Sequence, residues 1–224
     1  MMHRVAIFCC VLLVAATGPL WQPWAKAAGA VDPVKVVVLG DSLTAGYGLA
    51  ETNAFPQLLE RVLRERGHQV DIVNAGVSGD TATGALSRLG WAVQDGTDLV
   101  IVELGANDAL RGVAPQKTAA SLRAIIAWLK SRNIVVVLAG MRAPPNMGPD
   151  YEVEFNAIYS TLSREFDISL YPFFLDGVAA NPDLNLDDGI HPNEQGVAEI
   201  VSRMRPMIEA MIIDIAQNGD GAQQ

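Results

Sequence analysis

Three side chains in this sequence have the chemistry of a nucleophile, its base and a carboxylate that orients the base. Ser42 lies in Gly-Asp-Ser-Leu at 40–43, and His191 follows Asp188 by three residues. A neutral histidine accepts the serine proton at Nε2 while a carboxylate on its Nδ1–H fixes the tautomer. If Ser42 has a histidine base, that base is His191, because His68 lies in a polar helix-end sequence where a solvated side chain is expected.

Each of these residues also has a simpler interpretation. Asp-Ser directly before a helix is a common N-cap. Asp188 and His191, in front of the expected helix at 192–215, could likewise cap that helix or form half of a metal site. A metal site would need a second histidine or a cysteine to complete it, and the expected mature chain has no cysteine and no other histidine than His68, which we expect in solvent. We therefore expect no metal and no cofactor, and leave capping open.

Two further loops carry groups that could bind an oxyanion. Gly79 follows the second expected strand, and Asn107 follows the third. With the backbone N–H of Ser42, next to the positive end of the following helix, the Gly79 N–H and the Asn107 side-chain amide could converge on one oxygen. Such an arrangement suits acyl transfer. Each loop alone could be an ordinary turn. The evidence for a site is that all these loops occur in order along the chain, each after the appropriate element.

The elements that must position these residues follow from apolar patterning. Short β-branched runs alternate with longer helical patterns, which is typical of parallel βαβ units. The expected strands are 34–39, 70–73, 99–104, 134–139 and 169–171, and the expected helices are 55–65, 81–92, 115–131, 152–166 and 192–215. Sites of such sheets form at the carboxyl ends of the strands, and the commonest order for five strands is 2-1-3-4-5. We expect one α/β domain.

Four blocks in this order resemble the GDSL, or SGNH, hydrolase superfamily. They are Gly40-Asp41-Ser42-Leu43, Gly79, Gly105-Ala106-Asn107-Asp108 and Asp188-Gly189-Ile190-His191-Pro192. The resemblance covers 34 to about 211. It is closest to the bacterial periplasmic thioesterase I/lysophospholipase/arylesterase group, through the motifs at 77–81, 102–105, 110–112 and 171–174.

This resemblance implies a three-layer α/β/α, flavodoxin-like SGNH hydrolase fold. It also implies Ser42 as nucleophile, His191 as base, Asp188 as its partner, and Ser42, Gly79 and Asn107 as oxyanion donors. The implied substrates are small acyl esters, aryl esters, acyl thioesters and lysophospholipids. Two positions depart from the commoner family pattern: Ala106, where glycine is frequent, and the Ala-Pro-Pro sequence at 143–145. In relatives the second loop looks like part of the acyl pocket, so these departures affect the expected acyl-chain preference and leave the expected mechanism unchanged.

The N-terminal sequence predicts export. A short basic start precedes the apolar segment 5–16, and Ala25-Lys26-Ala27 fits a small-x-small cleavage site. We expect a signal peptide at 1–27, a linker at 28–33, the hydrolase domain at 34–215 and a disordered tail at 216–224. The mature protein would be periplasmic or secreted, without a stable membrane anchor; an uncleaved anchor is the alternative. Both cysteines, Cys9 and Cys10, fall inside the apolar segment.

Composition restricts the partners. The formal net charge is −9 and no basic run occurs, which argues against nucleic acid. We expect a monomer acting on small molecules. One alternative within the superfamily is a carbohydrate acetylesterase, which would need aromatic platforms, whereas we expect Trp91 and Trp128 to be core residues. An alternative of another class is a flavodoxin-like module that binds phosphate or flavin through Ser42 and Thr44.

Overall fold

The computed structural model describes residues 32–221, and its sheet has the predicted order. Five parallel strands lie in the order β2-β1-β3-β4-β5. Their bounds are Val34–Gly40 for β1, Val70–Gly76 for β2, Leu99–Glu103 for β3, Val135–Ala139 for β4 and Ser169–Tyr171 for β5. The expected signal peptide lies outside the described residues.

The central strands are apolar along their whole length because helices cover both faces of the sheet. All five residues of β3 are buried, as are six of the seven in β1. β2 is an edge strand, and its second half is only partly buried. It nevertheless continues to Gly76, beyond the expected end at Val73, since it pairs with β1 up to Gly40.

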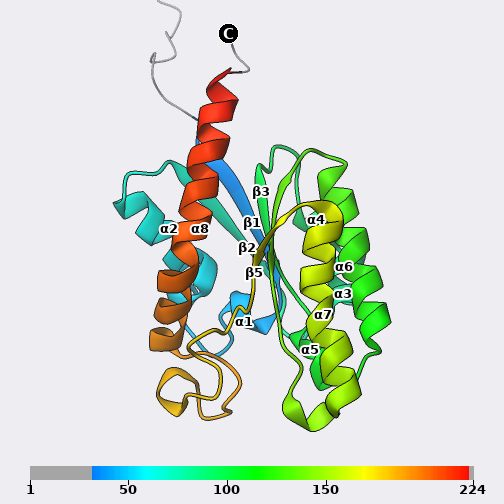
Figure 1. Ribbon diagram of the computed structural model, residues 1–224. Helices are drawn as coiled ribbons and strands as arrows, with labels where there is room; N and C mark the ends of the chain where they lie inside the picture. The colour runs from blue at the N-terminus through cyan, green and yellow to red at the C-terminus, as the bar shows by residue number, and fades with distance from the viewer. Residues whose placement is uncertain (1–31, 222–224) are drawn as a thin grey trace, which may run out of the picture. The chain divides into compact units, whose positions relative to one another are not determined.

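Helices form the two outer layers (Figure 1). On one side, α2 (Phe55–Glu65) packs against α8 (Glu194–Gly221). On the other lie α3 (Ala82–Ser87), α4 (Leu89–Ala92), α6 (Pro115–Lys130) and α7 (Pro149–Phe166). The short helices α1 (Ser42–Ala45) and α5 (Ala106–Leu110) follow β1 and β3 at the carboxyl end of the sheet. None of the described helices is both long and apolar enough to cross a membrane.

The helix expected at 81–92 is two helices, and the break changes the position of Trp91. Arg88, at φ −107° and ψ 5°, separates α3 from α4. Its Nε bonds Asp80 at 2.7 Å and its Nη2 donates to the Gly40 carbonyl at 3.1 Å. After the break, Leu89 faces the core and Trp91 is 79% exposed. The prediction that Trp91 is a core residue is therefore wrong. Trp128 is partly buried against the core.

Two other helix boundaries differ from expectation. α7 begins at Pro149 in place of residue 152, because proline is well suited to the first helical turn. α8 begins at Glu194, since Pro192 pairs with Asn185 in an isolated bridge, and it runs to Gly221. The helix thus extends past the start of the expected tail at 216, where residues 215 and 216 still pack against the core.

The backbone before α5 provides a test of how tightly this end of the sheet is packed. Gly105 has φ +120°, and a Cβ there would overlap the Tyr159 hydroxyl; Gly67 has φ +93°, and a Cβ there would meet nothing within 4 Å. We expect Gly67→Ala to lower the free energy of unfolding by about 1 kcal/mol through backbone strain. Gly105→Ala should cost about 3 kcal/mol, because overpacking adds to the strain. Urea unfolding measures both, and equal losses would show that Tyr159 moves aside freely.

Candidate active site

Ser42 is the first residue of α1, and its hydroxyl is not the helix cap. The cap is Asp41, whose Oδ1 accepts a hydrogen bond from the Leu43 N–H at 3.0 Å. The capping interpretation therefore holds for Asp41, and the Ser42 Oγ instead lies 3.0 Å from His191 Nε2. Because α1 has only four residues, its helix dipole is weak. The positive potential expected beside Ser42 therefore comes mainly from the nearby backbone N–H groups.

His191 has both ring nitrogens engaged. Nδ1 lies 2.7 Å from Asp188 Oδ2, and Nε2 faces Ser42. An ionised carboxylate only accepts hydrogen bonds, so the ring proton belongs on Nδ1 and Nε2 is free to accept from the serine hydroxyl. The same contacts leave no nitrogen for a metal ion. Among residues 32–221, no group of three or more His, Cys, Asp and Glu side chains has a geometry suited to a metal.

Asp188 also organises its own loop. Its Oδ1 accepts hydrogen bonds from the N–H groups of Ile190 and His191 at 2.9 and 3.0 Å. These backbone donors, that of His191 first, together with the imidazole lower the pKa of Asp188 to about 2. Gly189, between Asp188 and Ile190, has φ +68°, a conformation that glycine adopts without strain. The carboxylate is therefore ionised at neutral pH.

His68 lies elsewhere and is not a solvated side chain. Its Nε2 is 2.7 Å from Glu209 Oε1, in an ion-pair cluster that joins the end of α2 to α8. Arg66 and Arg205 contact the same carboxylate, and the Arg66 hydrogen bond is the largest of the causes that lower the pKa of Glu209 to about 2. The cluster is a contact between helices and leaves His191 as the histidine beside Ser42.

The Asn107 side chain points to the Ser42 loop. Its Nδ2 donates to Asp41 Oδ2 at 3.1 Å, so it does not bond its own backbone as a simple turn residue would. An amide nitrogen carries two protons, and the second is available to a ligand. Asn107, Ser42 and His191 line one cavity.

Gly79 is joined to the site through the neighbouring Asn107 loop. It has φ +82° in the loop after β2, and its carbonyl accepts a hydrogen bond from Arg111 Nη2 at 2.9 Å. Arg111 directly follows α5, so this bond joins the Gly79 loop to the Asn107 loop. No hydrogen bond to a protein acceptor occupies the Gly79 or Ser42 N–H in the described part of the chain. Ser42 lines the cavity with Asn107 and His191, whereas Gly79 is not among the residues that line it, so the structure brings Gly79 only to the neighbouring loop.

The cavity beside Ser42 has a volume of about 460 Å³ and a largely apolar wall. The guanidinium of Arg142, 4.6 Å from the Phe173 ring centroid, also belongs to this wall. Both departures from the commoner motif, Ala106 and the segment 143–145, lie in it too. Its apolar residues include Leu110, Met141, Ala143, Pro144, Pro145, Phe173, Leu175, Ala179 and Ile190.

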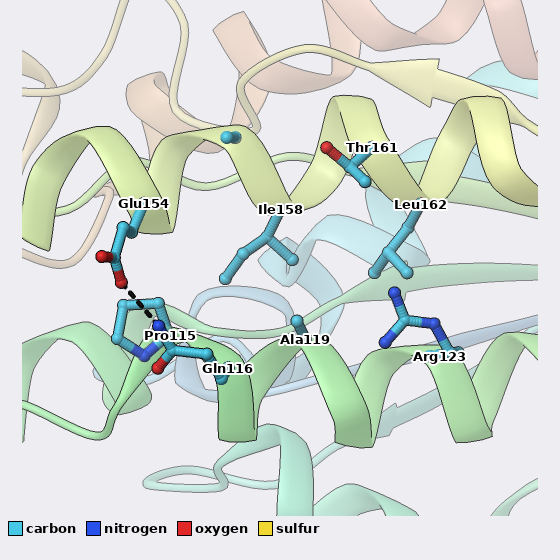
Figure 2. Close-up of a pocket in the computed structure, with 9 residues that line it drawn as sticks. Pro115, Gln116, Ala119, Arg123, Glu154, Ile158, Thr161 and Leu162 are labelled. Carbon is cyan, nitrogen blue, oxygen red and sulfur yellow. Dashed lines mark hydrogen bonds between the residues drawn. The ribbon is translucent and has the colours of Figure 1, made fainter.

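A second cavity lies far from this chemistry. It measures about 240 Å³ between α6 and α7, where Ile158 and Leu162 face Ala119 (Figure 2). Gln116 and Glu154 bond each other across it at 2.6 Å. It contains none of the predicted site residues, so the cavity at Ser42 is the functional candidate.

Tyr47 belongs to the site, and sequence reasoning missed it. Its ring centroid lies 4.4 Å from that of His191 at an interplanar angle of 34°. It follows α1 between Gly46 and Gly48, which have φ +83° and +76°. An aromatic residue between two glycines directly after the serine loop was the signal available in the sequence. The half-exposed Tyr47 ring thus contacts the imidazole directly.

The comparisons with known proteins agree with this geometry. Residues 38–198 match the model of the GDSL-like lipase/acylhydrolase family. An arylesterase of Vibrio mimicus is 40% identical over 173 residues, 75% of this chain and 86% of the relative. Thioesterase 1/protease 1/lysophospholipase L1 of Escherichia coli K12 is 39% identical over 178 residues, 79% and 84% of the two chains. The crystal structure of AlinE4, an SGNH-hydrolase family esterase, is 43% identical with a TM-score of 0.68, covering 80% of this chain and 97% of that one.

The hydrogen bond between Ser42 and His191 predicts a reactive serine. A fluorophosphonate should label Ser42 at one equivalent per chain, since the base withdraws its proton during attack. Labelling should be lost in Ser42→Ala and fall at least about 100-fold in rate in His191→Ala. Intact-protein and peptide mass spectrometry measure the label. His68→Ala is the matched control and should label normally; normal labelling of His191→Ala would contradict the assignment.

Proposed function

The chain belongs to the GDSL-like lipase/acylhydrolase family, and we propose that it hydrolyses carboxylic esters and thioesters through an acyl-enzyme on Ser42. The observation that carries this proposal is the relay from Asp188 through His191 to Ser42, with distances of 2.7 and 3.0 Å, at the wall of an apolar cavity. Aryl esters, acyl thioesters and lysophospholipids are the substrate classes we propose, in keeping with the names of the relatives.

In the proposed reaction, Ser42 Oγ attacks the acyl carbon and gives its proton to His191 Nε2. Asp188 stabilises the imidazolium that forms. The tetrahedral intermediate collapses when His191 returns the proton to the leaving alcohol or thiol. His191 then removes a proton from water, the hydroxide attacks the acyl-enzyme, and the acid is released as Ser42 regains its proton.

Negative charge on the carbonyl oxygen needs donors, and three are proposed. They are the N–H groups of Ser42 and Gly79 and the second N–H of the Asn107 side chain. An oxyanion donor of this kind contributes about 3 kcal/mol to the transition state. The acyl chain would lie along the apolar wall, whose volume is within the usual range for a small-molecule site.

Particular side chains argue against the carbohydrate acetylesterase and against the phosphate- or flavin-binding module. The exposed Trp91 on α4 and the partly buried Trp128 on α6 are absent from the residues that line the cavity, so neither offers a sugar platform there. A phosphate site would use Thr44, but its buried hydroxyl donates to the Asp41 carbonyl at 3.3 Å. The buried Asp41 carboxyl would also repel a phosphate.

We also propose export. The support is the sequence alone, with a basic start, the apolar segment 5–16 and the Ala-Lys-Ala site at 25–27. Expression in a bacterial host should give a periplasmic protein whose N-terminus is Ala28. Intact-mass measurement of the periplasmic and membrane fractions checks this. A membrane-bound chain that retains Met1 would instead indicate an uncleaved anchor.

The main test of the function is Asn107→Ala assayed on p-nitrophenyl esters and acyl-CoA thioesters of graded chain length. The wild type should hydrolyse both classes. The variant should lose about 100-fold or more in kcat, because the donor acts on the charge that develops in the transition state. KM should be nearly unchanged.

Ser42→Ala supplies the background rate, and circular dichroism shows whether each variant is folded. Asp188→Asn should be less damaging than Ser42→Ala, since it impairs the base but keeps the nucleophile. A wild type inactive on every ester and thioester would refute the proposed function. A folded, fully active Asn107→Ala would remove Asn107 from the oxyanion site.

A further inference from the structure

Two carboxyl groups lie buried beneath the site, and the mechanism uses neither directly. Asp41 precedes Ser42, and Glu103 ends β3, where it pairs in register with Gly40. Both side chains are fully buried. The Asp41 N–H lies 3.5 Å from Glu103 Oε2, so the two groups are close neighbours.

Their hydrogen bonds are unequal. The Asp41 carboxylate accepts from the Leu43 N–H at 3.0 Å and from Asn107 Nδ2 at 3.1 Å, one donor on each oxygen. Glu103 receives only the long contact from the Asp41 N–H, and its Oε1 has no hydrogen-bond partner among the described residues. Donated hydrogen bonds stabilise a charged carboxylate, and a charge without them is costly to bury. The negative charge therefore belongs on Asp41 and a proton on Glu103.

Electrostatics favour the same distribution. Burial, and then the charge of Asp41, raise the pKa of Glu103 well above its usual range. Burial also raises the pKa of Asp41, to about 6, against the opposing effect of the Leu43 and Asn107 hydrogen bonds. Among the other charged groups, His191 lowers the pKa of Asp41 and Asp108 raises it. The pair thus retains one proton at neutral pH.

Asp108 and Tyr159, which interact electrostatically with the pair, have hydrogen-bond partners of their own. Asp108 accepts from the Ala82 N–H at 2.9 Å and from Thr118 Oγ1 at 3.0 Å. The Tyr159 hydroxyl donates to the Leu104 carbonyl at 2.9 Å. Arg88 bonds Asp80 through Nε and the Gly40 carbonyl through Nη2, while its buried Nη1 has no hydrogen-bond partner among the described residues. No ion pair joins Arg88 to Glu103 in the described part of the chain.

We propose that Glu103 is a positioning residue, a buried carboxylic acid whose O–H donates to the Asp41 carboxylate and thereby holds the Asn107 amide in place. Asp41 Oδ2 accepts one N–H of Asn107, which directs the other towards the carbonyl oxygen of the substrate. The inference rests on the proposed function, since it assigns the support of one oxyanion donor in that site.

The same contact gives a reason for the glycine of Gly-Asp-Ser-Leu. A Cβ at position 40 would lie 2.9 Å from Glu103 Oε2 and from the Glu103 carbonyl oxygen, and would overlap the Thr44 hydroxyl. A larger residue would therefore crowd both Thr44 and Glu103, whereas the glycine leaves room for the Glu103 carboxyl beside Asp41.

The test compares Glu103→Gln with Glu103→Leu. Glutamine has the same shape and can donate an N–H to Asp41, so kcat should stay within about 3-fold of wild type. Leucine cannot donate, and kcat should fall about 10- to 100-fold with KM nearly unchanged, as expected when a buried charged acceptor loses its partner. Ile101→Val, a buried change on the same strand, is the control and should leave kcat unchanged. A fall in Glu103→Gln as large as in Glu103→Leu would overturn the inference.

A double-mutant cycle separates positioning from general loss of structure. In an Asn107→Ala background, Glu103→Leu should change kcat less than 2-fold, because the amide that it supports is gone. A similar 10- to 100-fold fall in both backgrounds would show that Glu103 acts only on the fold, and would contradict the proposal.

Infrared spectroscopy tests the proton without using activity. The wild type and Ser42→Ala should show the carbonyl band of a protonated carboxylic acid at pH 7.5, and Glu103→Gln should lack it. Absence of that band from the wild type would refute the inference, whatever the enzyme hydrolyses. Presence of the band in a chain that cleaves no ester would instead refute the proposed function.

Discussion

The parallel pairing of β1 with both β2 and β3 is the constraint on which the site depends. At the last residue of β1, Gly40 lies opposite Gly76 of β2 and Glu103 of β3. The three loops that follow must therefore emerge at one edge of the sheet. Ser42, Gly79 and Asn107 each occur within four residues of a strand end. Segments more than sixty residues apart are joined there by short hydrogen bonds, such as that between Asn107 and Asp41.

The histidine loop reaches this edge by a different route. It belongs to no strand of the sheet, and local contacts hold it in shape. Asn185 pairs with Pro192 in an isolated bridge, and the Leu186 N–H donates to the His191 carbonyl at 2.8 Å. The Asn185 side chain bonds the carbonyl oxygens of Val178 and Asn181. A loop stiffened in this way presents His191 to Ser42 before any substrate binds, which reduces the entropy lost in the reaction.

Sequence reasoning reached the sheet order from the commonest arrangement of five parallel strands, because local pattern reveals the strands and not their order. It grouped Ser42, Asp188 and His191 by their chemistry and by the resemblance to the GDSL family, since Ser42 and His191 lie 149 residues apart. β-branched runs mark buried strands, and few histidines compete for the role of base. It missed features that depend on tertiary contacts. Trp91 fits a helical core pattern only if one helix runs through 81–92, and the break at Arg88 leaves it exposed. The tilted contact of Tyr47 with His191 joins residues 144 positions apart, and the glycines on either side of Tyr47 mark its loop without revealing this partner.

Asp188 couples the shape of the histidine loop to the orientation of the imidazole. One carboxylate closes the turn through two backbone N–H groups and also bonds the imidazole, so loop shape and ring orientation share a single determinant. Four consecutive residues thus encode both the base and its partner. The same segment also borders the cavity through Gly189 and Ile190, so the loop that carries the base contributes to the wall as well. A glutamate at 188, one methylene longer, would alter the turn, the ring and this part of the wall together.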